Sequence, residues 1–237
     1  MLERLARDTA LDLAAATVVW RPVASRFAGG APEGYGHVEA SLPQAIATGG
    51  EADVRTYEEL KREAVACTRC RLADGRSQVV FSDGNPAARV MVVGEAPGAN
   101  EDRTGLPFVG AAGKLLDLLL ATVDLSRKDS VYICNVIKCR PPENRNPLPD
   151  EIAACSPFLR RQIALVQPEA ILAVGTFAGQ LLSGEERPLG KLRGEVYAYE
   201  GTPLIVTYHP AALLRNSGWT RSTWDDLQLL IRTLEDH

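Results

Sequence analysis

Five cysteines give this sequence its first candidates for chemistry. Cys67 and Cys70 form a C-x2-C pair at the end of a predicted helix, and Cys139 and Cys155 follow much later in the chain. Four thiols are typical of zinc sites and of iron–sulfur clusters, and their spacing does not separate the two. A redox dithiol is disfavoured because the pair follows a helix instead of preceding one. Cys134 lies inside an apolar run, where we expect a small core residue.

Glycine and polar residues gather where apolar runs end. Residues 90–93 lead into Gly94–Gly98, a Gly-Glu-Ala-Pro-Gly loop that lets backbone approach a ligand closely. Asn135 and His209 follow other apolar runs, and Phe108 precedes a predicted helix. Taken singly, each has a structural explanation, as a strand-end cap, a helix start or a core ring. Neither the phosphate loop G-x-x-x-x-G-K-S/T nor the dinucleotide motif G-x-G-x-x-G occurs, so nucleotide chemistry is not indicated.

Alternating strand and helix patterns must position these residues. Four apolar runs read as buried strands, at 90–93, 131–133, 170–174 and 204–206. Helices are predicted over 57–67, 112–123, 151–166 and 223–234. The alternation predicts an α/β fold of three layers, αβα, around a central, mostly parallel, four-stranded sheet. Ligands of such sheets bind at the carboxyl ends of the strands, which is where Asn135 and His209 lie.

Composition separates the start of the chain from the rest. Residues 1–56 are predicted to form an N-terminal extension, with a short helix in the first 20 residues and a linker rich in Gly, Pro and Ala over 27–53. Residues 57–237 are predicted to form the functional domain. A net charge of −4 neither supports nor excludes a nucleic-acid partner. No apolar run approaches the roughly 18 residues of a membrane span. Membrane contact is therefore not expected. An odd number of cysteines indicates a reducing compartment, so we expect a cytoplasmic protein, and we expect it to be a monomer.

Read together and in order, the motifs resemble those of the family 4 uracil-DNA glycosylases, the iron–sulfur branch of the uracil-DNA glycosylase superfamily. The resemblance runs from about Cys67 to Asp226, and residues 1–60 lie outside it. It rests on seven segments: Gly94–Gly98, Glu101–Asp102, Pro107–Gly110, Asn135–Pro142, Asn144–Arg145, Arg193–Gly194 and His209–Arg215.

This resemblance implies a DNA repair hydrolase. Its substrate would be single- or double-stranded DNA containing uracil; the enzyme would flip uracil out, hydrolyse the N-glycosidic bond and leave an abasic site. The resemblance also implies a 4Fe-4S cluster as cofactor. Its ligands would be Cys67, Cys70, Cys139 and Cys155.

The chemistry of uracil gives the pocket residues distinct roles. The carboxamide of Asn135 can complement both O4 and N3–H of uracil, whereas cytosine presents the reverse order of donor and acceptor. Phe108 would stack on the extruded ring, and His209 would donate a hydrogen bond to O2 as negative charge accumulates there. The pocket wall is expected to consist of Gly94, Glu95, Ala96, Pro97 and Gly98.

Water activation is assigned to a carboxylate. Sister families carry an acidic residue or Asn at the position that Ala96 resembles, and alanine cannot handle water. Glu101 is therefore predicted as general base or oxocarbenium stabiliser, with Glu95 as the second candidate.

The remaining motifs are assigned to DNA. Leu213 and Leu214 would push an apolar wedge into the duplex as uracil leaves. Phosphates would be contacted by Asn144, Arg145, Arg193 and Arg215. Two alternatives stay open: a protein that traps uracil-DNA covalently through a histidine insertion after Gly110, and an iron–sulfur DNA-binding protein without catalysis.

Overall fold

A computed structural model describes residues 21–22 and 51–236, with side chains from Thr56 onward. The predicted helix in the first 20 residues lies outside the described residues, as does most of the predicted linker. The helix expected from residue 57 begins earlier, at Glu51, and ends at Val65.

The described residues form one sheet of seven strands, in the order β1-β6-β7-β5-β3-β4-β2. Its centre is the predicted set of four parallel strands, but the prediction of four strands in all is wrong. β6 and β2 add antiparallel pairs to β7 and β4, and β1 pairs with β6 in parallel. The strands are β1 (Arg21–Pro22), β2 (Asp83–Gly84), β3 (Val90–Gly94), β4 (Val131–Asn135), β5 (Ala170–Val174), β6 (Val196–Tyr199) and β7 (Thr202–Thr207).

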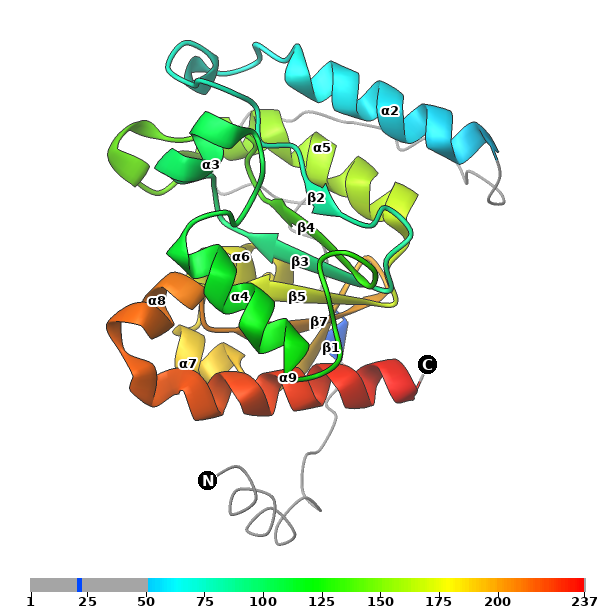
Figure 1. The fold of residues 1–237 in the computed structure, drawn as a ribbon, viewed down its shortest axis with the longest axis vertical. Helices are drawn as coiled ribbons and strands as arrows, with labels where there is room; N and C mark the ends of the chain where they lie inside the picture. Colours follow the sequence, from blue (N-terminus) through cyan, green and yellow to red (C-terminus); the bar gives the residue numbers. More distant parts are fainter. Residues whose placement is uncertain (1–20, 23–50, 237) are drawn as a thin grey trace, which may run out of the picture.

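Helices cover both faces of this sheet, which confirms the predicted αβα layers (Figure 1). On one face the strands pack against α2, α5, α6 and α7, and on the other against α4, α8 and α9. The helices are α2 (Glu51–Val65), α3 (Ala99–Thr104), α4 (Ala111–Ala121), α5 (Pro149–Val166), α6 (Thr176–Ser183), α7 (Leu189–Leu192), α8 (Pro210–Arg215) and α9 (Thr220–Glu235).

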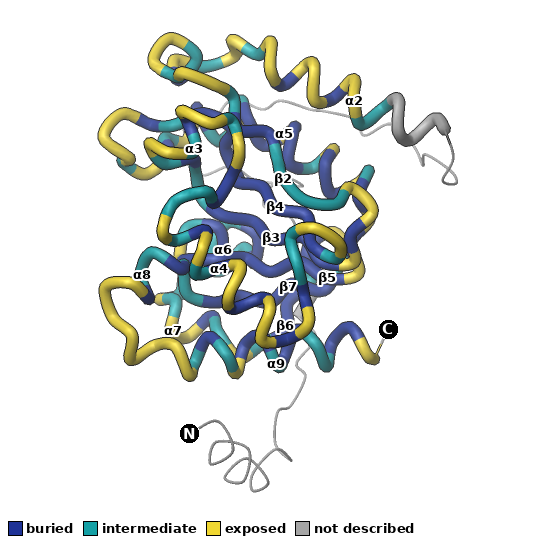
Figure 2. Tube along the Cα trace, in the orientation of Figure 1, coloured by how far each residue is buried: buried dark blue, intermediate teal, exposed yellow. Residues whose placement is uncertain are grey.

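Strand alternation divides the apolar residues between two cores. Along β4, Tyr132 and Cys134 belong to the core under α2 and α5, while Val131 and Ile133 belong to the core under α4 and α9. Both sets are fully buried, so the central strands form the continuous buried layer in Figure 2. Cys134 is accordingly a core residue.

Parallel register aligns the ends of the central strands. Gly94 of β3 is paired with Asn135 of β4, and Val174 of β5 with Thr207 of β7. The loops after all four strands therefore open on one edge of the sheet. Among the described residues, no helix has both the length and the apolar character to cross a membrane.

Candidate functional site

A cleft of about 700 Å³ opens at the carboxyl edge of the sheet. It brings Asn135, from the end of β4, together with His209, from the loop after β7. Most of the residues predicted for the site line it: Glu95, Ala96, Pro97, Gly98, Glu101, Phe108, Asn135, Asn144, Arg145, His209 and Arg215.

The floor of the cleft depends on Gly94. A Cβ atom at this position would overlap the Asn135 side-chain oxygen and would lie 2.7 Å from Cζ of Phe108. Glycine is therefore required here, because backbone, amide and ring meet at van der Waals contact. Asn135 itself is 2% exposed, and its backbone carbonyl accepts a hydrogen bond of 2.6 Å from Nζ of the buried Lys138.

His209 lies directly before α8. Its Nδ1 accepts a hydrogen bond of 3.1 Å from the backbone N–H of Ala211. The imidazole stacks on Phe108 with ring centroids 5.5 Å apart. Burial, aided by nearby Arg215 and opposed by Glu101, lowers the pKa of His209 to about 4. The ring is therefore neutral near pH 7.

A buried polar network supports the His209 loop from behind. The Thr207 hydroxyl donates to Asp226 at 2.6 Å, and Nε of Arg193 donates to the same carboxylate oxygen at 2.7 Å. The Arg193 guanidinium lies 4.7 Å from the ring centre of Tyr208, whose other neighbour is the stacked ring of Trp219 at 4.8 Å. Burial raises the pKa of Asp226 to about 6, against the lowering effect of Arg193.

In this network, Arg193 has a different environment from the one predicted. It was predicted to contact DNA, but its side chain is 13% exposed, is bonded to Asp226 and the carbonyl of Ser222, and does not line the cleft. The pairing with a buried carboxylate gives Arg193 a structural role in supporting this loop.

The two predicted carboxylates differ in their environment. Oε1 of Glu101 accepts hydrogen bonds from the backbone N–H groups of Val109 and Gly110, at 3.0 and 3.1 Å. It therefore fixes the two residues that directly precede α4. Glu95 lies on the cleft wall, and burial raises the pKa of its carboxyl.

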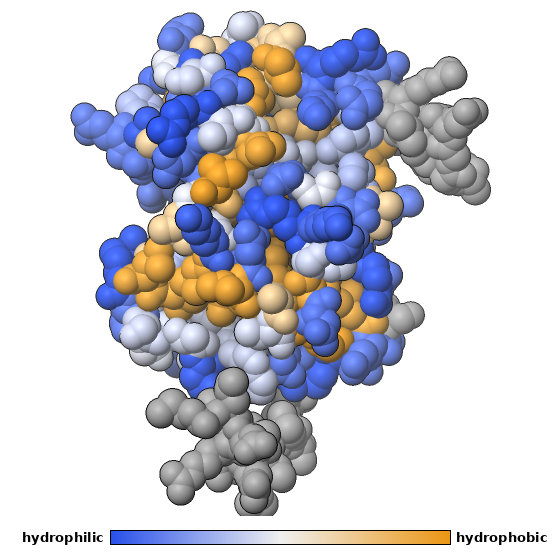
Figure 3. All heavy atoms as spheres, viewed as in Figure 1, coloured by the Kyte–Doolittle hydropathy of each residue, from blue (hydrophilic) through white to orange (hydrophobic). Residues whose placement is uncertain are grey.

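The predicted leucine wedge is divided between core and surface. Leu214 is 54% exposed, whereas Leu213 is 3% exposed and packs in the core under α4 and α9. A one-residue step on a helix turns a side chain by about 100°, and here that step takes the side chain from the core at Leu213 to the surface at Leu214. Hydrophobic side chains gather on the surface over α4 and α8 (Figure 3).

Arg145 is paired but still lines the cleft. Its guanidinium makes two hydrogen bonds, of 2.6 and 2.9 Å, to the fully buried carboxylate of Glu151 at the start of α5. The pairing fixes the 142–148 loop against α5. Asn144 is held in the same loop by Nε of Arg140, 2.8 Å from its side-chain oxygen.

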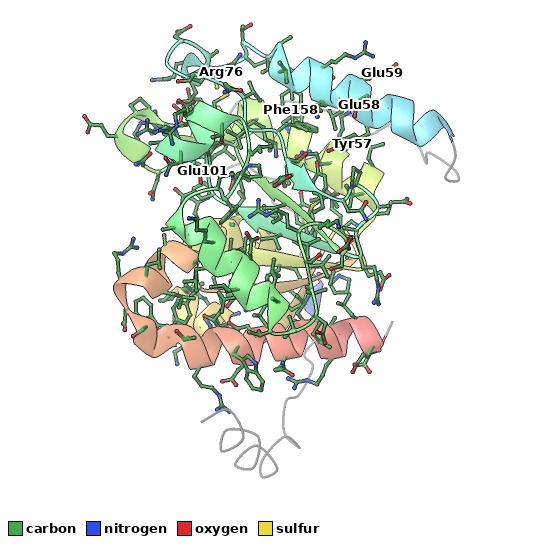
Figure 4. All side chains as sticks on the ribbon, viewed as in Figure 1. Tyr57, Glu58, Glu59, Arg76, Glu101 and Phe158 are labelled. Carbon is green, nitrogen blue, oxygen red and sulfur yellow. The ribbon has the colours of Figure 1, made fainter. Side chains whose placement is uncertain are left out.

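The four predicted ligand cysteines line a second, small cavity: Cys67, Cys70, Cys139 and Cys155. Three basic side chains, those of Arg69, Arg76 and Lys138, line it as well. Arg76 donates to Sγ of Cys139 at 3.3 Å, and the backbone N–H of Lys138 donates to Sγ of Cys155 at 3.2 Å. Figure 4 shows Phe158 on α5 and Arg76 in the loop that follows α2, with Glu101 on α3.

Burial raises the pKa of Cys155 to about 11, with Lys138 opposing the shift. Cys139 is affected in the same direction by burial, and Arg76 opposes it. Within the described residues, no three His, Cys, Asp or Glu side chains converge as a site for one metal ion.

Sequence reasoning missed one wall of the cleft. Gly175 follows β5 with φ of +98°, and a Cβ there would lie 3.2 Å from Cβ of His209. The signal was available, because a Gly-Thr step directly after a predicted parallel strand marks a ligand edge. The missed lining residues include Thr176, Phe177, Gln180 and Leu189.

Comparison with known proteins agrees with this geometry. Residues 81–228 match the family described as the uracil DNA glycosylase superfamily. The chain is 43% identical over 181 residues to the type-4 uracil-DNA glycosylase of Sulfurisphaera tokodaii, covering 73% of this chain and 82% of the relative. The type-4 enzymes of Archaeoglobus fulgidus and Thermotoga maritima are 41% and 47% identical, over 68% and 63% of this chain and 84% and 79% of theirs. The chain belongs to the uracil DNA glycosylase superfamily, in its type-4 family.

Proposed function

We propose that this protein removes uracil from DNA by hydrolysing the N-glycosidic bond, releasing free uracil and leaving an abasic site. The observation that carries the proposal is the meeting of Asn135, Phe108 and His209 in one cleft of about 700 Å³. An amide, an aromatic ring and a neutral imidazole are the groups needed to read, stack and release a pyrimidine.

Base reading is assigned to Asn135. Its carboxamide lies at the buried end of the cleft, where an unpaired polar group is costly. Uracil pairs with both its NH2 and its carbonyl, whereas cytosine leaves both mismatched. A site of this kind can reject the wrong base by roughly 10⁴-fold.

Release of the base is assigned to His209. Because Nδ1 accepts from the Ala211 amide, the ring hydrogen lies on Nε2, which is the donor that His209 can offer to uracil O2. The departing base gains negative charge at O2, and a fixed donor stabilises that charge in the transition state. The hydrogen bond requires no proton transfer from the imidazole.

Water activation is assigned to Glu95 in preference to Glu101. The Glu95 carboxyl has a raised pKa and so accepts a proton more readily than an ordinary carboxylate. Glu101 has one oxygen bonded to two backbone amides, which gives it a positioning role.

The cysteine cavity is assigned to a 4Fe-4S cluster, held by Cys67, Cys70, Cys139 and Cys155. Four cysteine sulfurs line one small cavity, and Arg76 and the backbone N–H of Lys138 donate hydrogen bonds to two of them, as donors to the sulfurs do in iron–sulfur sites. The cluster would supply structural cross-linking between α2, the loop after β4, and α5.

The two alternatives have less support. Trapping of DNA would need a histidine insertion after Gly110, but α4 begins at Ala111. His209 is the sole histidine among the described residues. A protein without catalysis would have no use for a buried amide and imidazole in a shared cleft. We further propose that the enzyme acts as a cytoplasmic monomer.

The proposal is tested by uracil release. Purified protein with intact iron and sulfide is incubated with an oligonucleotide that carries one uracil, single-stranded or in a duplex. Free uracil is measured by chromatography and the abasic site by alkaline cleavage, with thymine and cytosine oligonucleotides as controls. We expect turnover on uracil alone. Absence of uracil release would contradict the proposal, and a stable protein–DNA adduct would support trapping.

A further inference from the structure

Phe108 has a backbone conformation that aromatic residues rarely adopt. Its φ is +53°, in the left-handed region, and it is not a glycine. Its side chain is 6% exposed, stacks on His209 and closes the floor at Gly94. Such a conformation persists only where the surrounding structure determines it, and it often marks a functional site.

Arg127, which lies outside the cleft, holds Phe108 in this backbone conformation. It lies between α4 and β4 and does not line the cleft. Its NH1 donates to the carbonyl of Pro107 at 2.9 Å, and its NH2 donates to the carbonyl of Phe108 at 2.8 Å. The carbonyl groups on both sides of the Phe108 Cα are thereby fixed by one guanidinium.

Two carboxylates hold the guanidinium itself. NH1 of Arg127 is 2.8 Å from Asp83 of β2, and Nε is 3.0 Å from Asp117 of α4. The Arg127 side chain is 19% exposed, so these pairs are shielded from water more than a surface ion pair is. The planar fork of arginine can meet two carboxylates and two carbonyls at once, which the single ammonium of lysine cannot do.

The other sides of the segment are also closed. A Cβ at Gly113 of α4 would overlap the Phe108 carbonyl oxygen, so this oxygen lies directly against the helix. Oε1 of Glu101 accepts hydrogen bonds from the next two backbone N–H groups, those of Val109 and Gly110. The carbonyl groups are thus fixed by Arg127 and the amide groups by Glu101, with the ring projecting into the cleft between them.

We propose that Arg127 is a positioning residue for base stacking. It holds the Phe108 peptide in its left-handed conformation, with Asp83 and Asp117 as its supports, and thereby sets the affinity of the cleft for an extruded pyrimidine. This inference rests on the proposed function and extends it to a residue that does not touch the substrate.

A double-mutant cycle with Phe108 tests the proposal. Free uracil serves as the probe, and its inhibition constant is measured against a single-stranded uracil oligonucleotide. Arg127→Met should weaken uracil binding about tenfold, the order of one aromatic stacking contact. In a Phe108→Ala background the same change should have less than about twofold effect, because the ring that Arg127 positions is gone. Equal effects in both backgrounds would overturn the proposal.

Two further variants separate positioning from loss of folding. Arg89→Met removes an exposed ion pair with Glu169 at the start of β3, away from the cleft, and should change the uracil inhibition constant less than about twofold. Arg127→Lys keeps the charge, and its crystal structure should show Phe108 displaced from positive φ. An unchanged Phe108 in that structure would also overturn the proposal. An inactive wild-type protein would contradict the proposed function, whereas additive effects in an active enzyme contradict the Arg127 assignment alone.

Discussion

Nδ1 of His209 accepts a hydrogen bond from the backbone N–H of Ala211, 3.1 Å away, in the first turn of α8. A backbone amide can only donate, so the imidazole proton must lie on Nε2 whenever the ring is neutral. The chain therefore fixes the tautomer of the imidazole before any ligand arrives. A donor that needs no reorientation is the kind that stabilises developing charge most effectively.

His209→Ser should slow bond cleavage with little effect on DNA binding. Loss of one preorganised donor to a developing anion costs roughly 10²- to 10³-fold in rate. Single-turnover kinetics at saturating enzyme report the chemical step, and a titration of labelled DNA reports binding. A variant that binds more weakly but cleaves at the normal rate would contradict the assignment.

The depressed pKa of His209 predicts a loss of stability in acid. The unfolded chain takes up a proton near pH 6.5, whereas the folded chain does so only near pH 4, so the unfolding free energy falls as pH drops between these values. The slope is at most about 1.4 kcal/mol per pH unit. Asp226, whose pKa is raised to about 6, contributes in the opposite direction over the same range.

The difference between wild type and His209→Ser therefore isolates the histidine. Urea unfolding at several pH values should show the gap between the two proteins changing in favour of the variant as pH falls from 6.5 to 4. A constant gap would show that His209 has an ordinary pKa.

Asn135→Asp should relax the choice between uracil and cytosine. A protonated carboxyl group at this position can offer a donor to cytosine N3 and an acceptor to its exocyclic amine, which the wild-type amide cannot do so well. We expect the ratio of uracil to cytosine release to fall by at least about 100-fold. Asn135→Ala is the control, because it removes the hydrogen bonds to uracil without creating new ones to cytosine. An equal ratio of uracil to cytosine release in wild type and Asn135→Asp would show that Asn135 does not select the base.

Two adjacent leucines should behave differently. Leu214→Ala should reduce activity on duplex DNA several-fold while leaving single-stranded activity and thermal stability unchanged, because Leu214 is exposed. Leu213→Ala should lower the unfolding free energy by about 2 to 5 kcal/mol, the usual cost of a core leucine. Rates on matched single-stranded and duplex substrates, with urea melts, separate the two effects. A duplex defect for Leu213→Ala at normal stability would contradict this division.

Loss of the proposed cluster should release α2 from α5. Cys139→Ser should lose iron and sulfide, and trypsin should cut several-fold faster in the loop that contains Arg69, Arg71 and Arg76. Cys134→Ala is the matched control, because Cys134 is a core residue outside the cavity. It should keep both iron and sulfide. Full iron content in Cys139→Ser would exclude that cysteine as a ligand.

The sequence was sufficient to predict a strand where one physical signal dominated. Runs such as 90–93 and 170–174 are apolar on both faces, which only a buried parallel strand requires. β6 was missed, although Glu200 and Gly201 form its two-residue turn with φ of +49° and +89° and a short hairpin turn ending in Gly is a recognised signal. β2 has two residues and no pattern of its own.

Side-chain partners were the part that sequence could not supply. Arg193 looked like a phosphate ligand because nothing in its neighbourhood along the chain reveals Asp226, which lies on α9. Likewise, Leu213 and Leu214 differ only in the phase of a six-residue helix, too short for its pattern to show which leucine faces inward. Contacts between distant segments decide such cases.

The pairing of Gly94 with Asn135 means that the Asn135 side chain lies against main chain without a side chain on the neighbouring strand. On that side of the pocket, the distance between the two backbones is the spacing of hydrogen-bonded strands, about 4.8 Å, and a change of side-chain rotamer cannot alter it. Evolution of a new base preference in this scaffold has to proceed by exchanging the amide or reshaping the other walls. Side-chain substitutions cannot gradually widen the floor, because the floor at Gly94 is backbone.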